Sequence, residues 1–209
     1  FAGLAVIGCF VVAEVAARLV VAPQDLTHQE HRRTIDVLGL PALNETMEFD
    51  SFLFWRLKKD VPGLRIAGKI RNNEIDFAVT THNHLRSPPV AETKSRYRIL
   101  AIGDSCTFGL GVNDDQTWPA QLQAKLDREG YQAEVVNAGV PGYTAFQGMR
   151  YLHRDGLKLK PDVVVASFGF NDFDLWASRS DVQTARYLAL RRWELIFVRS
   201  RLYLGLRNG

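Results

Sequence analysis

The sequence predicts an α/β fold in which helices cover both faces of a parallel sheet. Three short apolar runs, at 97–103, 133–138 and 163–168, have the length and composition of buried strands. Two segments with apolar residues at helical spacing, 117–129 and 143–159, lie between these runs. Because buried strands that alternate with amphipathic helices over short loops form parallel sheets, we expect the order β-α-β-α-β.

Local signals at the ends of the elements agree with this order. In the first predicted helix, Trp118, Leu122 and Leu126 recur at helical spacing, and Gly130 follows as a stop signal. Upstream of the sheet, residues 64–81 alternate weakly between apolar and polar side chains, which predicts short strands (RIAGKI and IDFAVTT). The sequence therefore places a small β region before the α/β unit.

The first 22 residues predict a transmembrane anchor. Residues 1–22 are apolar except for Glu14 and Arg18, and their number approaches the roughly 20 residues that span a bilayer. Glu14 and Arg18 can pair on one helix face, which lowers the cost of placing either near lipid. Pro23 marks the end of the helix. A cleavable signal peptide and a buried or amphipathic soluble helix are the alternatives.

The chain divides into three predicted parts: the anchor at 1–22, a juxtamembrane linker with a small accessory β region at 23–96, and the main domain at 97–209. Within the main domain, the basic stretch 186–207 mixes arginine with bulky apolar residues. We expect it to be a helical segment packed on the core, or one lying on an anionic membrane surface. The net charge of +3 is concentrated there, so the body is not a surface for nucleic acid.

The loops that follow the three predicted strands carry residues suited to acyl transfer. They read GDSCTFG at 103–109, NAGVPG at 137–142 and GFND at 169–172. Because parallel strands present their carboxyl ends at one edge of the sheet, we expect Ser105, Gly139 and Asn171 to converge there. Their convergence would place a hydroxyl next to hydrogen-bond donors at the predicted ligand-binding edge.

These residue types match the needs of nucleophilic attack on a carbonyl group. Ser105 is flanked by small residues that permit a tight turn, and its backbone N–H, that of Gly139 and the side-chain amide of Asn171 could hold an oxyanion. Gly139 has no side chain, so its N–H can approach the reacting carbon closely. We expect Asp104 and Asp172 to support their loops through hydrogen bonds instead of taking part in the chemistry.

Taken together, GDSCTFG, NAGVPGYT and GFND resemble blocks I, II and III of the SGNH/GDSL hydrolase family, over residues 97–174. The resemblance implies a flavodoxin-like three-layer α/β/α fold, ester hydrolysis or acyl transfer, and no metal or organic cofactor. It implies that Ser105 is the nucleophile and that Gly139 and Asn171 are oxyanion-hole donors. Upstream, FWRLK and TTHNHLRSP resemble membrane-anchored bacterial members of the family more weakly.

The sequence departs from the family pattern at its catalytic base. Members carry Asp and His in a D-x-x-H block near the C-terminus, whereas no histidine follows Asn171 in this chain. A serine without a base is a weak nucleophile. We expect the chain to be cut before that block, the alternative being a non-catalytic relative. The histidines, all upstream, are His28, His31, His82, His84 and His153.

Other reactive side chains have plainer explanations. Cys106 stands beside Ser105 and is expected to be a buried small residue. His82 and His84 would share one face of a strand and could bind a metal, but no third ligand is apparent, so a surface or packing role is expected. His153, on the second predicted helix, is expected to be structural.

The sequence therefore predicts a serine esterase or O-acyl hydrolase that is membrane-anchored, with its catalytic domain outside the cytoplasm (periplasm or cell surface). In the complete protein, Ser105 would attack an acyl ester of an envelope glycan, a lipid or a small molecule, helped by His and Asp beyond residue 209. An O-acyltransferase with the same site and a non-catalytic module that binds acylated glycans are alternatives. A nucleotide-binding flavodoxin-like protein is disfavoured, because the chain lacks a glycine-rich phosphate loop.

Overall fold

The computed structural model describes residues 12–16, 40–70, 72–173, 181–183 and 185. The predicted anchor at 1–22 therefore lies outside the described residues except for the helical stretch 12–16, and the basic segment 186–207 lies wholly outside them. Within the described part of the chain, every helix is too short or too polar to cross a membrane. The anchor stays a prediction.

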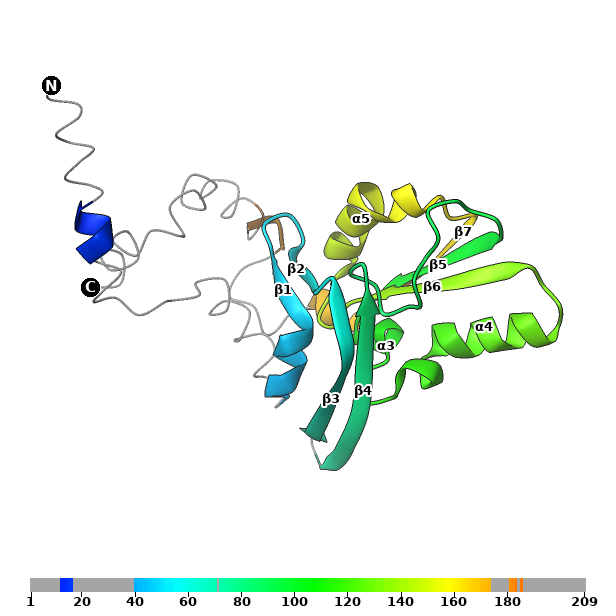
Figure 1. The fold of residues 1–209 in the computed structure, drawn as a ribbon, viewed down its shortest axis with the longest axis horizontal. Helices are drawn as coiled ribbons and strands as arrows, with labels where there is room; N and C mark the ends of the chain where they lie inside the picture. The colour runs from blue at the N-terminus through cyan, green and yellow to red at the C-terminus, as the bar shows by residue number, and fades with distance from the viewer. Residues whose placement is uncertain (1–11, 17–39, 71, 174–180, 184, 186–209) are drawn as a thin grey trace, which may run out of the picture.

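A parallel sheet of three strands forms the centre of the described chain, in the order β6-β5-β7 (Figure 1). The strands are β5 (Tyr97–Gly103), β6 (Ala133–Gly139) and β7 (Val163–Ser167), which confirms the three predicted strands. In register, Gly103 of β5 lies opposite both Gly139 of β6 and Ser167 of β7. This order is that of the first three strands of the flavodoxin-like arrangement.

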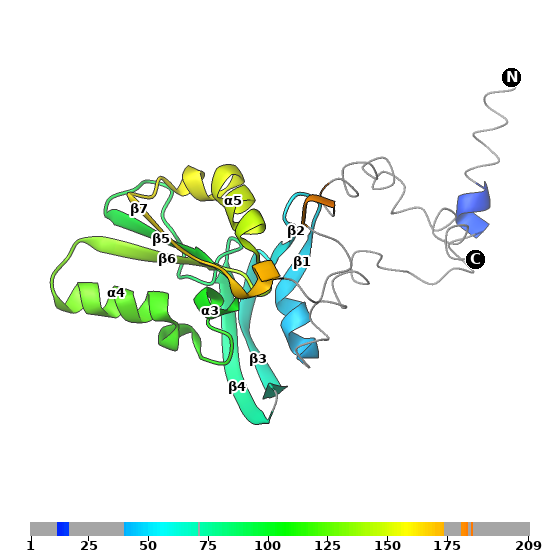
Figure 2. The same cartoon turned by 180° about the vertical axis from the view of Figure 1, so that it is seen from behind.

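Two helices connect these strands and lie on opposite faces of the sheet, as Figures 1 and 2 show. They are α4 (Trp118–Arg128) and α5 (Ala145–Arg154). The Thr144 hydroxyl accepts a hydrogen bond from the backbone N–H of Gln147 and forms a capping box that starts α5. The second predicted helix is broken, because α5 ends at Arg154 and a 3-10 turn, η3 (Gly156–Leu159), follows.

The covering of the sheet differs between its strands. Most residues of β5 and β6 are buried, as expected for parallel strands. Four of the five residues of β7 are exposed in the described part of the chain.

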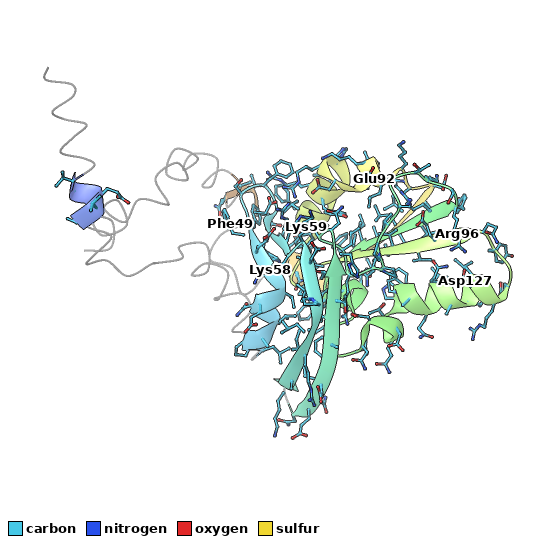
Figure 3. All side chains as sticks on the ribbon, in the orientation of Figure 1. Phe49, Lys58, Lys59, Glu92, Arg96 and Asp127 are labelled. Carbon is cyan, nitrogen blue, oxygen red and sulfur yellow. The ribbon has the colours of Figure 1, made fainter. Side chains whose placement is uncertain are left out.

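An ion pair joins the start of β5 to α4. Arg96, just before β5, pairs with Asp127 of α4 at 2.9 Å (Figure 3). Both side chains are partly exposed, so this pair adds little to stability.

Two antiparallel hairpins precede the sheet along the chain. A 3-10 turn, η1 (Pro41–Thr46), leads into the first hairpin, β1 (Met47–Asp50) and β2 (Phe54–Leu57). The second hairpin is β3 (Asp60–Ile70) and β4 (Asn73–His82). It confirms the short strands predicted within 64–81. The observed strands are longer, because β3 begins before residue 64 and β4 ends after residue 81.

The hairpins pack directly on the α/β unit. A single cluster of buried side chains includes Leu53 and Phe77 from the hairpin region together with Leu100, Val136 and Tyr143 from the sheet region. The cluster crosses the boundary that the sequence places at residue 96. Burial of apolar surface is the main favourable contribution to folding, so the hairpins and the sheet stabilise one another.

Candidate active site

Ser105 is the first residue of α3 (Ser105–Phe108), a single helical turn that follows β5. The Asp104 carboxylate caps this turn, because its Oδ1 accepts a hydrogen bond of 2.9 Å from the backbone N–H of Cys106. At the other end, the N–H of Gly109 donates to the Ser105 carbonyl at 3.0 Å. Gly109 has a φ of 88°, a left-handed conformation that glycine adopts without strain. Both ends of the turn that carries Ser105 are therefore fixed.

Two glycines let α3 lie against the ends of the strands. A Cβ atom on Gly139 would stand 2.2 Å from the backbone nitrogen of Phe108, and one on Gly103 would stand 2.1 Å from Oγ1 of Thr107. No side chain fits in either space. Each glycine is therefore required for the close approach of α3 to the sheet.

Backbone hydrogen bonds tie the three strand ends together around the start of α3. The N–H of Val140, just after β6, donates to the Gly103 carbonyl at 3.0 Å. The N–H of Asp104 donates to the carbonyl of Ser167, the last residue of β7, at 3.3 Å. The three predicted loops therefore start at one edge of the sheet, as the parallel arrangement requires.

The backbone N–H of Gly139 is already engaged within the protein. It donates a hydrogen bond of 3.0 Å to the side-chain oxygen of Asn137, which is itself buried. The Asn137 side chain also donates from Nδ2 to the Phe108 carbonyl at 3.4 Å. Asparagine often bonds to backbone groups two residues away in this manner. The Gly139 N–H expected to face the reacting carbon thus binds a neighbouring side chain in this structure.

A second glycine in the same loop has an available donor. Gly142 has a φ of 79°, and its N–H makes no hydrogen bond within the described residues. The N–H of Tyr143 donates to the Val140 carbonyl at 3.2 Å, which closes a turn with Pro141 and Gly142 at its centre. Our sequence reasoning passed over Gly142, although a Pro-Gly pair is a strong turn signal and positions the glycine with positive φ.

The loop after β7 binds the loop after β6. The side-chain amide of Asn171 donates from Nδ2 to the Tyr143 carbonyl at 2.9 Å. The neighbouring Asp172 accepts at Oδ1 a hydrogen bond of 2.8 Å from the N–H of Ala145, the first residue of α5. A primary amide has two N–H groups, and the described residues supply an acceptor for one of those of Asn171.

The hairpin β1–β2 also binds the Gly142 turn. The indole N–H of Trp55 donates to the Pro141 carbonyl at 2.9 Å, and the Tyr143 hydroxyl donates to the Trp55 carbonyl at 2.7 Å. Farther along, the Gln147 side chain donates to the Leu53 carbonyl at 2.8 Å. Burial raises the pKa of Tyr143 well above its ordinary value, and the Asp50 carboxylate adds to the shift. The Tyr143 hydroxyl therefore stays protonated and acts as a structural donor.

Cys106 is exposed, which corrects the prediction that it is a buried small residue. The reason lies in the short helix, where the next two residues, Thr107 and Phe108, fill the interior and Cys106 is turned outward. Partial burial raises the pKa of the Cys106 thiol, and the negative charge of Asp104 raises it further. The thiol is therefore mostly protonated at neutral pH, and no described group in its surroundings activates it as a nucleophile.

The described histidines lie at the end of β4, in the turn that follows it and in α5. His84 has a φ of 68° in the turn after β4, so it does not share a strand face with His82 as predicted. Its Nδ1 lies 2.9 Å from the Leu57 carbonyl and 3.6 Å from the Glu48 carboxylate. His153 lies in the last turn of α5. No group of three His, Cys, Asp or Glu side chains in the described residues could hold a metal ion.

A cavity of about 190 Å³ lies between the β1–β2 hairpin and α5. Neither Ser105 nor Asn171 lines it, so it is separate from the candidate nucleophile. Its walls combine apolar side chains with charged ones at the rim, and include Leu53, Arg56, His84, Leu85, Val140, Tyr151, Arg154 and Asp155.

Comparisons with known proteins show what the sequence is similar to. Residues 101–200 match the GDSL-like Lipase/Acylhydrolase family. The chain is 40% identical over 74 residues to Esterase TesA of Pseudomonas aeruginosa, covering 35% of this chain and 37% of that protein. It is 28% identical over 82 residues to an Arylesterase of Vibrio mimicus, covering 39% of this chain and 41% of that protein.

A third similar protein is an Acetylxylan esterase of Xylanibacter ruminicola, 38% identical over 98 residues, with 43% of this chain and 20% of that protein covered. The chain thus spans between 20% and 41% of the length of these curated relatives. Among solved structures, the SGNH-hydrolase family esterase AlinE4 is 28% identical at a TM-score of 0.34, over 52% of this chain and 57% of that one. TesA is 33% identical at a TM-score of 0.36, over 48% and 55%.

Proposed function

Because the chain carries a domain of the GDSL/SGNH hydrolase family, we propose that it is part of a serine esterase in which Ser105 attacks the carbonyl carbon of a carboxylic ester. The observation that carries this proposal is the position of Ser105. Ser105 begins a helical turn at the sheet edge from which the loops that carry Gly142 and Asn171 also start. The Asn171 side chain donates a hydrogen bond to the Tyr143 carbonyl, next to Gly142. A reacting carbonyl at this edge would meet a nucleophile and donors together.

In the proposed reaction, the Ser105 oxygen forms a bond to the carbonyl carbon and the carbonyl oxygen becomes negative. Three N–H groups are suited to hold that oxygen: the backbone groups of Ser105 and Gly142, and the second N–H of the Asn171 amide. The N–H at the start of a helix has no partner within the helix, which leaves that of Ser105 free to donate. Such preorganised donors usually make the largest contribution to acyl transfer.

The proton of Ser105 passes to a base, and the ester C–O bond breaks as the alcohol leaves with that proton. Water then attacks the acyl-enzyme, releases the acid and restores the Ser105 hydroxyl. We propose that the base is a histidine outside the described residues, as the family pattern implies. We do not assign this role to His82 at the end of β4, to His84 in the turn that follows, or to His153 of α5.

The ester class is the part of the proposal that the relatives support, since three of them are named esterases. We further propose an acylated glycan or lipid of the cell envelope as substrate, with the protein anchored by its apolar residues 1–22 and its ester site outside the cytoplasm. The apolar run and the acetylxylan esterase relative support this choice. Acyl release measured with and without glycan acceptors separates hydrolysis from acyl transfer.

The decisive experiment is covalent labelling of the complete natural protein with a fluorophosphonate probe. We expect the wild type to be labelled and Ser105→Ala to remain unlabelled. Cys106→Ala is the matched control, because it changes the adjacent exposed side chain and should be labelled like the wild type. Labelling that survives Ser105→Ala would remove Ser105 from its proposed role.

A further inference from the structure

Arg86 is a buried arginine whose N–H groups are all engaged. Its side chain is 0% exposed and lies between the β3–β4 hairpin, the 109–114 loop and α3. Arginine has five N–H donors, and each one of Arg86 has an acceptor. Nε donates to Asp114 at 2.8 Å, Nη1 to the carbonyls of Phe108 at 3.0 Å and Gly109 at 2.7 Å, and Nη2 to those of Ala78 at 2.9 Å and Val112 at 2.7 Å.

Aromatic rings enclose the same guanidinium group. Its central carbon lies 4.6 Å from the ring centre of Phe108 and 5.7 Å from that of Phe77. Burial lowers the pKa of Arg86, and the Asp114 carboxylate offsets part of this shift. Because the ordinary pKa of arginine is far above neutrality, the group stays charged. A charge is costly to bury unless it is paired and hydrogen-bonded, and Arg86 satisfies both conditions.

These contacts lead directly to the turn that carries Ser105. The carbonyls of Phe108 and Gly109 stand at the end of α3, and the last carbonyls of a helix have no partner within it. The Gly109 N–H in turn donates to the Ser105 carbonyl at 3.0 Å. Arg86 thus joins the far end of α3 to the β3–β4 hairpin through Ala78.

We propose that Arg86 is a positioning residue that holds α3, and hence Ser105, in register with the loops that carry Gly142 and Asn171. This inference rests on the proposed esterase function. Buried ion pairs often stabilise a fold no better than apolar side chains of similar size, whereas a fork of fixed donors specifies geometry. Removing Arg86 leaves four backbone carbonyls and Asp114 without this donor, so we expect it to lower the free energy of unfolding as well as to displace the nucleophile.

Arg98 provides a matched control within the same protein. It is 1% exposed and stands near the amino end of β5, the opposite end of the strand from Ser105. Its Nε donates to Glu134 at 2.7 Å, and its other groups donate to the carbonyls of Ala91 and Leu159. Arg98 is thus buried and hydrogen-bonded like Arg86, but none of its contacts reaches the three loops of the site.

The test compares Arg86→Met with Arg98→Met in the complete natural protein, using hydrolysis of a p-nitrophenyl ester and circular dichroism to correct for the folded fraction. For Arg86→Met we expect kcat to fall by about 10²-fold with KM unchanged, the size of effect that small misplacement of a reacting group produces. For Arg98→Met we expect kcat of the folded fraction to match the wild type. Arg86→Lys keeps the positive charge but loses the planar guanidinium group with its five N–H donors. We therefore expect kcat of this variant to fall as well, with KM unchanged.

The outcomes separate this inference from the proposed function. An active wild type with an equally active Arg86→Met overturns the role of Arg86 alone. Equal losses of kcat in the folded fractions of Arg86→Met and Arg98→Met also overturn it, since any buried arginine would then serve. If Arg86→Met does not fold, Arg86→Lys decides, and full kcat in that variant overturns the inference. A wild type with no esterase activity overturns the proposed function and the inference with it.

Discussion

The hydroxyl of Tyr143 donates a hydrogen bond of 2.7 Å to the backbone carbonyl of Trp55. The indole of Trp55 donates in return to the carbonyl of Pro141 at 2.9 Å. Pro141 and Tyr143 flank Gly142, so the strand β2 holds both sides of the turn that presents the proposed oxyanion donor. A donor that is fixed before the reaction needs no reorganisation when the charge develops.

Tyr143→Phe removes one of these two hydrogen bonds and keeps the aromatic ring. We expect the free energy of unfolding to fall by about 1–2 kcal/mol, because the part-buried Trp55 carbonyl loses the hydrogen bond from Tyr143. Urea denaturation measures this change. Tyr131→Phe is the control, because Tyr131 is 57% exposed and should change stability by less than about 0.5 kcal/mol. Equal stabilities of the two variants would contradict the structural role of the bond.

Asn171→Ala should lower kcat of the proposed esterase by about 10²–10³-fold, the usual effect of losing one oxyanion donor. Asp172→Asn is the control next to it, since its side chain can still accept from the Ala145 N–H. Steady-state kinetics on a p-nitrophenyl ester give both values. If Asn171→Ala kept its kcat, the proposed role of the amide would be wrong.

Gly139→Ala tests the close approach of α3 to the sheet. The added methyl group would stand 2.2 Å from the Phe108 nitrogen, a backbone atom that cannot move away cheaply. We expect a loss of about 3 kcal/mol or more in unfolding free energy, at the upper end of overpacking effects. Gly156→Ala is the comparison, because its nearest atoms lie 3.1 Å away on flexible leucine side chains. A thermal melt that ranks Gly156→Ala as the less stable variant would contradict the packing described here.

Asp50 gives the stability a specific dependence on pH. Its carboxylate accepts from the N–H groups of Phe52 and Leu53 and from Arg154 at 2.7–2.8 Å. Burial alone would raise the pKa of Asp50, but the hydrogen bonds from Leu53 and Arg154 outweigh it and bring the pKa below its ordinary value of 3.8. The folded state therefore binds this proton less readily than the unfolded state. The contribution of Asp50 is present above the ordinary value and is lost as the pH falls through the folded value.

We expect Asp50→Asn to lower the unfolding free energy by about 2 kcal/mol at neutral pH, since hydrogen bonds to a charged group are lost. The difference from the wild type should shrink as the pH falls below 3.8. Denaturation curves at several pH values measure it. Glu74→Gln is the control, because its side chain is 83% exposed and should change little at any pH. A difference that grows in acid would have the wrong sign.

The thiol of Cys106 should react slowly with iodoacetamide at neutral pH although it is exposed. Partial burial and the Asp104 carboxylate raise its pKa above the ordinary value of 9.0, and only the thiolate is a good nucleophile. In a Cys9→Ser background, the alkylation rate should reach half its maximum above that value. A half-maximal rate near neutrality would show instead that the thiol is activated.

The architecture of the sheet could be predicted because its signals are local. Strand β5 contains the apolar run 99–102, and α4 shows helical spacing from Trp118 onward, with Gly130 just after its end. The places of Ser105 and Asn171 in the fold were also predictable, since each follows a strand and parallel strands end at one edge. Those inferences need only the order of residues along the chain.

The parts that were missed depend on side-chain partners distant in sequence. Whether the N–H of Gly139 is free depends on the rotation of the Asn137 side chain, which no periodicity reveals. The bond between Trp55 and Pro141 joins residues 86 positions apart. Cys106 is exposed because the packing of α3 buries the next two residues, Thr107 and Phe108, instead. Such relationships arise from tertiary contacts.

The two hairpins have a consequence for anyone who recombines this protein with its relatives. One hairpin is bonded to the loop after β6 through Trp55, and the other to α3 through Arg86. A crossover placed just before β5 would join the three loops of the candidate site from one parent to supporting hairpins from another. Chimaeras that inherit residues 40–90 and the sheet as one block should keep their turnover, whereas those divided at residue 96 should fold yet hydrolyse esters poorly.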